Sequence, residues 1–164
     1  MLGASNVGKS SFIERITYKK AEKYSNGIIS RILYVKIKNS IFDIYLGDCW
    51  GQECFMSVRR DEVQNADGII LMYDITDNES FESSKYFYDD KIKSLCKKNI
   101  KKLLLGNKCD LKEKRVIIRE QGLKFASENN YKFKEISCCT NENVFEAFEE
   151  FILDIYNDLL NKKN

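Results

Sequence analysis

The sequence predicts an α/β domain in which a mostly parallel, six-stranded sheet carries helices on both faces. Two continuous apolar runs, 66–73 and 102–106, have the pattern of strands that are buried on both faces. Helical stripes of apolar residues lie between the strand patterns, and this alternation is typical of a parallel sheet. Near the N-terminus, residues 3–10 read Gly-Ala-Ser-Asn-Val-Gly-Lys-Ser and fit G-x-x-x-x-G-K-[ST], which places the fold among the P-loop NTPases.

Length and composition limit the classes of protein to consider. The 164 residues suit one core, so we predict a single domain over 1–164. A net charge of +2 is nearly balanced and argues against nucleic acid as a partner. Histidine is absent, which excludes histidine catalysis and leaves oxygen atoms to bind any metal. The six cysteines form no C-x-x-C pair, so we expect reduced thiols in a cytoplasmic protein.

The phosphate loop should lie between a buried strand and a helix. Only Met1 and Leu2 come before Gly3, so the first strand is largely absent from these residues. We expect several further apolar residues before Met1 in the natural protein. After the loop, apolar residues within 12–16 share one helical face.

The remaining elements follow from apolar periodicity. A polar segment containing Gly27 leads to an edge hairpin with strands 33–37 and 42–46 and a turn at 38–40. A last strand covers 131–136. Three apolar stripes predict helices, namely Phe81, Tyr88, Ile92 and Leu95; Phe125 and Ala126; and Phe145, Phe148, Ile152, Ile155 and Leu159.

The phosphate loop has the residue types that hold a nucleotide's phosphates. Gly3 and Gly8 can take backbone angles that other residues avoid, so the loop can curl around an anion. Lys9 would reach the β- and γ-phosphates, and the Ser10 hydroxyl would hold Mg²⁺. The helix that begins here would point its positive end at the same phosphates. The predicted phosphate contacts are Gly3, Ser5, Asn6, Val7, Gly8, Lys9, Ser10 and Ser11.

A D-x-x-G motif follows the strand 42–46, at the edge where an open parallel sheet binds ligands. Asp48 is placed to bind Mg²⁺ through water, so Ser10 and Asp48 form the predicted metal site. Gly51 can offer its N–H to a γ-phosphate because it has no side chain to block the approach. Gln52 would orient the attacking water and is the predicted catalytic residue.

An N-K-x-D motif follows the strand 102–106 and predicts selection of guanine. The Asp110 carboxylate can accept hydrogen bonds from guanine N1–H and from the N2 amine. Asn107 can contact N7 and brace the phosphate loop, and the Lys108 stem can lie over the ring. Adenine lacks the two donors. A site whose buried acceptor is left unpaired by the wrong ligand discriminates against that ligand by a factor of roughly 10⁴ or more.

The loop after the last predicted strand completes the base site. Ser137, Cys138 and Cys139 would supply backbone amides, and the Cys138 N–H could donate to guanine O6. The four motifs occur in chain order at successive strand ends, which makes coincidence improbable.

The motifs together resemble those of the small GTPases of the Ras superfamily, and within it the Rab branch. The stretches that carry the resemblance are Gly8-Lys9-Ser10-Ser11-Phe12, Gly51-Gln52-Glu53, Tyr73-Asp74-Ile75-Thr76-Asp77 with Glu79-Ser80-Phe81, residues 105–111, and Asn143-Val144 with Ala147-Phe148. The resemblance implies a switch that binds GTP or GDP with Mg²⁺, hydrolyses GTP slowly and acts in vesicle transport. It also implies that Tyr24 packs on the guanine.

The resemblance extends to partners and location. An exchange factor, a GTPase-activating protein and effectors would bind through residues around 24–37 and 48–64. A lipidated tail outside these residues would hold the protein on the cytosolic face of intracellular membranes. The protein would otherwise be cytoplasmic.

Some positions depart from the family pattern, Arg31 and Trp50 among them. Arg31 stands where the family has a Thr that binds Mg²⁺, and Trp50 replaces a small residue near the γ-phosphate. These departures leave open a second reading, a nucleotide-binding scaffold with little or no GTPase cycling. A third reading, a P-loop kinase that uses ATP, is opposed by the N-K-x-D motif.

Overall fold

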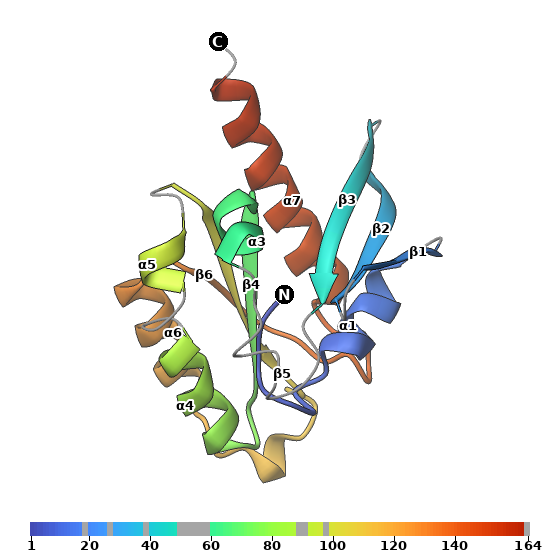
Figure 1. Cartoon of the computed structure of the whole chain (residues 1–164). Helices are drawn as coiled ribbons and strands as arrows, with labels where there is room; N and C mark the ends of the chain where they lie inside the picture. The colour runs from blue at the N-terminus through green and yellow to red at the C-terminus, as the bar shows by residue number, and fades with distance from the viewer. Residues whose placement is uncertain are drawn as a thin grey trace.

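The computed structural model describes residues 1–17, 20–25, 28–37, 40–48, 60–87, 92–96 and 99–162. In chain order its elements are α1 (Lys9–Ile16), β1 (Lys20–Ser25), β2 (Ile28–Ile37), β3 (Ser40–Asp48), α3 (Arg60–Asn65), β4 (Gly68–Asp74), α4 (Asn78–Phe87), α5 (Lys93–Leu95), β5 (Lys101–Asn107), a 3₁₀ turn (Lys112–Lys114), α6 (Arg119–Glu128), β6 (Lys132–Glu135) and α7 (Val144–Asn161) (Figure 1). From β4 onward strands and helices alternate, and the predicted α/β class is confirmed.

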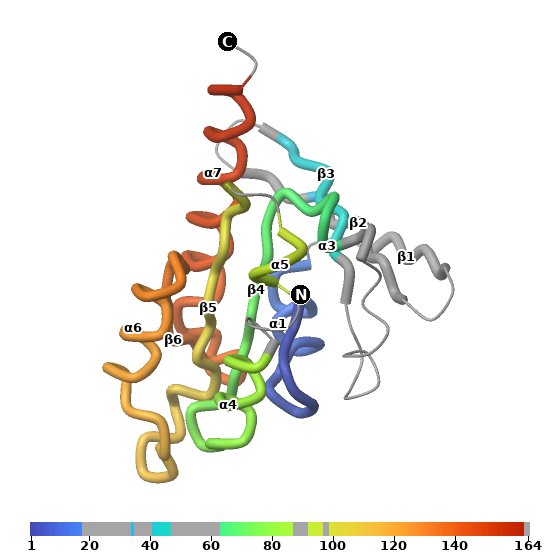
Figure 2. Tube along the Cα trace, turned by 60° about the vertical axis from the view of Figure 1, so that its left-hand side comes forward, coloured from blue at the N-terminus to red at the C-terminus, as the bar shows by residue number. Residues whose placement is uncertain are grey.

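The described strands form two sheets of different kinds. The strands β4, β5 and β6 are parallel, with Asp74 opposite Asn107 and Gly106 opposite Glu135. The strands β1, β2 and β3 are antiparallel, with Tyr34 opposite Asp43. In Figures 1 and 2 the N-terminal residues lie beside β4, and Figure 1 shows β3 on their other side.

The parallel sheet separates two apolar cores because its strands alternate their side chains between the faces. One face contributes Met72 and Leu105 to the core with α1 and α7. The other contributes Leu71 and Leu104 to the core with α4 and α6. Figure 1 shows α4, α5 and α6 on one side of the sheet and α1 and α7 on the other. Full burial of each such side chain contributes about 1.5–3 kcal/mol.

The residues before the phosphate loop continue the sheet for one step. The Leu2 N–H donates to Ile70 O at 2.8 Å, and the Met72 N–H donates to Leu2 O at 2.9 Å. This is an isolated parallel bridge between Leu2 and Leu71. Of the predicted first strand, the described residues therefore contain this single bridge to β4.

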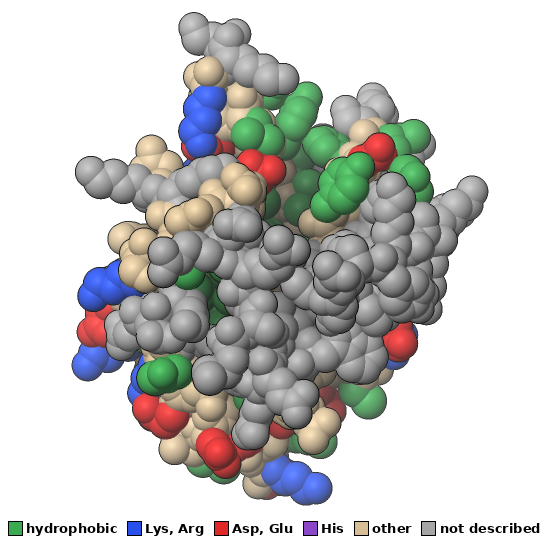
Figure 3. Space-filling model, viewed as in Figure 1, with side chains coloured by type: hydrophobic (Ala, Val, Ile, Leu, Met, Phe, Trp, Pro, Cys, Tyr) green, Lys and Arg blue, Asp and Glu red, His purple; other side chains and the backbone are tan. Residues whose placement is uncertain are grey.

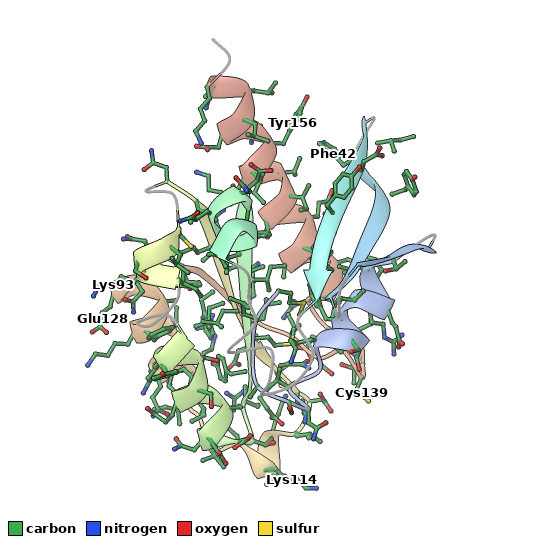
Figure 4. The ribbon with its side chains drawn as sticks, viewed as in Figure 1. Phe42, Lys93, Lys114, Glu128, Cys139 and Tyr156 are labelled. Atoms are coloured by element: carbon green, nitrogen blue, oxygen red, sulfur yellow. The ribbon has the colours of Figure 1, made fainter. Side chains whose placement is uncertain are left out.

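A cavity of about 490 Å³ lies between β3 and β4 over α7, with Leu2, Leu46, Ile70 and Ile155 in its wall. Figure 3 shows hydrophobic side chains gathered near the top of the molecule, between the end of α7 and β3. At that end Phe42 and Tyr156 meet edge to face at 5.0 Å, as their labels in Figure 4 indicate.

Some elements differ from those that periodicity predicts. The polar segment before the hairpin contains β1, because pairing with β2 satisfies its backbone and polar side chains do not prevent a strand. Of the stripe from Phe81 to Leu95, Phe81 lies in α4, Leu95 lies in α5, and Tyr88 lies outside the described residues. In α7, Phe145 is 51% exposed, and its neighbour Val144 is buried. The helix α3 was not predicted.

Candidate functional site

The phosphate loop runs from the Leu2 bridge to the first turn of α1, and its two glycines are required by geometry. Gly3 has φ of 149° and Gly8 has φ of 101°. A Cβ atom on Gly3 would lie 2.3 Å from Met72 O, and one on Gly8 would lie 2.1 Å from the Asn107 Nδ2 atom. A side chain at either position would therefore displace the loop from β4 or from the N-K-x-D loop.

The lysine of the loop is buried, with 7% of its surface exposed. Lys9 Nζ donates to Gly3 O at 2.8 Å and to Ala4 O at 2.7 Å, so the loop closes around the ammonium group. The helix α1 begins directly after Gly8, and its first N–H groups have no carbonyl acceptor within the helix. The positive lysine and the helix N-terminus together suit a phosphate group.

The other predicted phosphate contacts divide into two groups. Ser5 and Asn6 are exposed in the loop, and Ser10 and Ser11 are exposed in the first turn of α1. Asn6 has φ of 61°, which a short polar residue tolerates. The Val7 side chain is fully buried in the core with α1 and α7, so Val7 can offer only its backbone to a ligand.

Asn107 connects the phosphate loop to the loop after β6. Its Nδ2 donates to Val7 O at 2.8 Å, which confirms the predicted brace. Its Oδ1 accepts from the Cys138 N–H at 3.1 Å. That N–H was predicted to donate to guanine O6, and in this structure it donates to Asn107. Asn107 is 2% exposed, so both hydrogen bonds are shielded from water.

Lys108 is held by an acidic partner that sequence reasoning missed. Its Nζ lies 2.5 Å from Asp74 Oδ2 at the end of β4. Asp74 Oδ1 accepts 2.8 Å hydrogen bonds from Thr76 N–H and Thr76 Oγ1. The Ser80 hydroxyl accepts from the Asp74 N–H at 3.0 Å. The Y-D-I-T-x-x-x-S-F pattern is therefore a turn that fixes a carboxylate beside the N-K-x-D loop.

Asp110 has an unused acceptor. Its Oδ1 atom is buried and has no hydrogen-bond partner among the residues that the structure describes. Leaving a buried acceptor unpaired costs about 1–3 kcal/mol, and the cost is higher for a charged group. Such an atom therefore indicates a hydrogen-bond donor outside the described residues, as a bound ligand would supply. The neighbouring Cys109 is buried, and burial raises the pKa of its thiol to about 11, so the thiol is neutral at pH 7.

The loop after β6 is shaped by Ser137 and held from α1. The fully buried Ser137 accepts from the Thr140 N–H at its Oγ, at 3.0 Å, and its own N–H donates to Glu142 O. The Ser137 side chain therefore stabilises the conformation of its own loop. Burial raises the pKa of the Cys138 thiol to about 11, and Cys139 is exposed. Arg15 of α1 donates to both the Cys138 and Cys139 carbonyls, a contact that sequence reasoning missed.

The rest of the predicted site is described partly or not at all. Gly51 and Gln52 lie outside the described residues, as does Trp50. Tyr24 lies in β1 and Asp48 is the last residue of β3, and the structure describes only their backbone. Their roles remain predictions.

Neither a cluster of metal ligands nor a membrane-spanning helix is present among the described residues. They contain no group of three or more Cys, Asp or Glu side chains placed to hold a metal ion. None of their helices is long and apolar enough to cross a bilayer.

The α/β sheet, the phosphate loop and the two loops tied to it define a P-loop nucleotide-binding domain. Comparison with known proteins gives the family, because the Ras family model matches residues 1–157. Ras-related protein Rab-13 of Canis lupus familiaris is 35% identical over 158 residues, which cover 94% of this chain and 77% of that protein. The chain therefore belongs to the Ras family, as a Rab-like small GTPase.

Two yeast proteins are similar over the same region. GTP-binding protein ypt2 of Schizosaccharomyces pombe is 31% identical over 167 residues, covering 100% of this chain and 83% of that protein. GTP-binding protein YPT1 of Saccharomyces cerevisiae is 34% identical over 151 residues, covering 90% of this chain and 73% of that protein. The predicted resemblance to the Rab branch is confirmed.

Proposed function

We propose that this protein is a guanine-nucleotide switch that binds GTP and GDP with Mg²⁺, hydrolyses GTP slowly and regulates vesicle transport. The observation that carries the proposal is the buried Oδ1 atom of Asp110, which has no hydrogen-bond partner within the described part of the chain. Guanine presents the N1–H and N2 amine donors that this carboxylate lacks, and adenine presents neither. A guanine base would therefore remove the cost of the unpaired acceptor, and an adenine base would leave it.

The contacts of Asn107 support a single ligand that spans both loops. Its side chain joins Val7 of the phosphate loop to Cys138 of the base loop. Base and phosphates of one nucleotide would thus bind to loops held in fixed relative positions. Lys9, Gly8 and the first turn of α1 would take the phosphates, and Lys108 and Asp110 would take the guanine.

The residues present also fit a magnesium ion. Ser10 is exposed in the first turn of α1, and Asp48 ends β3. A hydroxyl and a carboxylate, with phosphate oxygens and water, are the hard oxygen ligands that Mg²⁺ takes. The ion would neutralise charge that develops on the phosphates. Gln52 would orient the attacking water, Gly51 would contact the γ-phosphate, and Tyr24 would pack on the base.

Family membership supports the proposed partners. An exchange factor, a GTPase-activating protein and effectors would bind residues around 24–37 and 48–64. Tyr34 of β2 is 43% exposed, which is consistent with a partner surface because aromatic side chains are enriched at interfaces. A lipidated tail outside these residues would hold the protein reversibly on the cytosolic face of intracellular membranes.

A second candidate, a nucleotide-binding scaffold with little or no GTPase cycling, is favoured by the position of Arg31. Its backbone pairs with Glu22 on one side and with Leu46 on the other. A residue held in two ladders cannot move toward a metal ion without breaking backbone hydrogen bonds. Arg31 also lacks the hydroxyl that binds Mg²⁺ in the family pattern.

The test is to denature the purified protein and identify the nucleotide that it releases, followed by competition with GDP, GTP and ATP. We expect GDP or GTP in the released fraction and displacement of labelled GDP by GTP but not by ATP. Equal competition by ATP and GTP would contradict guanine recognition. Single-turnover hydrolysis then separates the two candidates, because the scaffold would show no measurable phosphate release.

A further inference from the structure

The last turn of α1 contains an arginine whose side chain reaches a loop more than a hundred residues away. Arg15 Nε donates to Cys138 O at 2.9 Å across a separation of 123 residues. Arg15 Nη2 donates to Cys139 O at 3.1 Å. Figure 4 labels Cys139, which lies beside α1. One guanidinium group therefore holds two consecutive carbonyls, each through a different nitrogen of its planar fork of donors.

This contact differs from what an arginine at a helix end usually does. Basic residues in a last turn commonly bond their own helix's carbonyls or stabilise the negative end of the helix dipole. Arg15 directs its donors to another loop instead. The charge of the guanidinium also acts on that loop, where it opposes the burial that raises the pKa of the Cys138 thiol.

The Cys138 and Cys139 peptides are consequently fixed from two directions. The Cys138 N–H donates to Asn107 Oδ1, and the carbonyls of Cys138 and Cys139 accept from Arg15. Arg15 belongs to the helix that begins at the phosphate loop. A rigid helix with the phosphate loop at its start thus sets the position of the base loop at its end.

We propose that Arg15 is a positioning residue for guanine: it holds the loop of Cys138 and Cys139 so that a backbone N–H of this loop is aimed at O6 of the base. This rests on the proposed function, because it assumes that the site takes a guanine nucleotide. Arg15 touches neither base nor phosphate and acts through the loop. Its loss leaves Asp110 and Lys9 in place but lets the O6 donor move.

The first measurement is the dissociation rate of fluorescently labelled GDP at saturating Mg²⁺ for the full chain and for Arg15→Ala. We expect release to be faster by roughly tenfold, the effect expected when a charge-assisted hydrogen bond is lost. Arg15→Lys keeps the charge but replaces the planar fork of donors with a single nitrogen, and we expect a release rate between those of the unmodified protein and Arg15→Ala. Arg119→Ala is the matched control. Arg119 is the first residue of α6 and lies over the Phe133 ring, so its substitution should leave the GDP release rate unchanged.

The second measurement distinguishes positioning from general stabilisation. 6-Thioguanosine diphosphate keeps N1–H and the N2 amine but replaces O6 with sulfur, a weak acceptor. The unmodified protein should prefer GDP to this analogue, and Arg15→Ala should lose most of that preference. Arg119→Ala should keep it. If Arg15→Ala does not fold, the ratio of the affinities for GDP and for the analogue is measured on Arg15→Lys instead.

The outcomes are distinguishable. Failure of the unmodified protein to bind GDP would overturn the proposed function itself. Binding of GDP with equal release from Arg15→Ala and Arg119→Ala would overturn the role of Arg15 alone. Faster release with an unchanged preference for GDP over the analogue would also overturn it, because Arg15 would then not act at O6.

Discussion

The parallel sheet of this protein is covered by helices on both faces, whereas the antiparallel sheet has one exposed face. The predicted base-binding loops follow strands of the first sheet, and the predicted D-x-x-G motif begins at the end of the second. Leu71, Met72, Leu104 and Leu105 in the parallel sheet are fully buried, with helices on both faces. In the antiparallel sheet, by contrast, β3 exposes Ile41 by 72% and Tyr45 by 73%. Only the other face of β3 packs on α7.

The difference has a consequence for the proposed site. The N-K-x-D loop and the loop of Ser137 follow strands of the doubly covered sheet, and Asn107 and Arg15 tie them together. Asp48 is the last residue of β3, which has one exposed face, and the predicted Gly51 and Gln52 come after it in the sequence. Recognition of the base would thus rest on the loops of the parallel sheet, whose rearrangement would expose buried apolar side chains on both faces. The response to the γ-phosphate would belong to residues after the antiparallel sheet, which has less buried apolar surface to expose.

The largest expected effect is on base recognition. Asp110→Ala should weaken GDP binding by about 10³-fold or more, because it removes the acceptor for two guanine donors. The unfolding midpoint in urea should fall little, since the removed carboxylate already has an unpaired buried oxygen. Titration calorimetry with GDP measures the first effect, and retained affinity would contradict the role of Asp110.

The contrast between the sheets can be tested by one pair of truncations. Leu104→Ala removes a fully buried side chain and should cost about 2–5 kcal/mol of unfolding free energy. Ile41→Ala removes an exposed one and should change stability by about 0.5 kcal/mol or less. Urea unfolding of both variants measures this. Similar losses would mean that the two sheets are equally covered.

A smaller effect is expected for the metal. Ser10→Asn should weaken GTP binding in Mg²⁺ more than GDP binding, by roughly tenfold in the ratio of the two affinities, because Mg²⁺ would neutralise the additional phosphate charge of GTP. Affinities measured with Mg²⁺ and with a chelator give the ratio. An unchanged preference in Mg²⁺ would exclude Ser10 as a metal ligand.

The rate of GTP hydrolysis tests the residues that belong to or follow the antiparallel sheet. We expect slow single-turnover hydrolysis that Gln52→Leu reduces further, since Gln52 is the predicted orienter of water. Arg31→Thr combined with Trp50→Ala should raise the rate several-fold if these residues only destabilise the GTP state. A rate insensitive to Gln52→Leu would show that another group positions the water.

The smallest effect concerns alkaline pH. Burial raises the pKa of the Cys109 and Cys138 thiols from 9.0 to about 11. A raised folded-state pKa gives stability that is complete below pH 9 and lost as the pH rises towards 11, because the unfolded thiols ionise first. Urea unfolding at pH 8, 9.5 and 11 should show a decline that is smaller in Cys138→Ala. A flat profile would mean that these thiols ionise equally well when folded.

Much of this protein was determined by local sequence. The strand and helix alternation, the hairpin and the apolar face of α1 follow from periodicity, because burial of an apolar stripe requires it. Gly3 and Gly8 are identifiable from the motif, since no other residue suits those backbone angles and close approaches. The brace from Asn107 to the phosphate loop was also predicted correctly.

The remainder was decided by tertiary structure. Contacts between residues far apart in the chain have no periodicity to reveal them, and Arg15 with Cys138 and Lys108 with Asp74 are of this kind. The polar strand β1 exists because β2 supplies its hydrogen-bond partners, which propensity cannot foresee. Phe145 is exposed for a similar reason: the direction in which α7 faces the sheet, rather than the hydrophobicity of a residue, decides which side chains are buried.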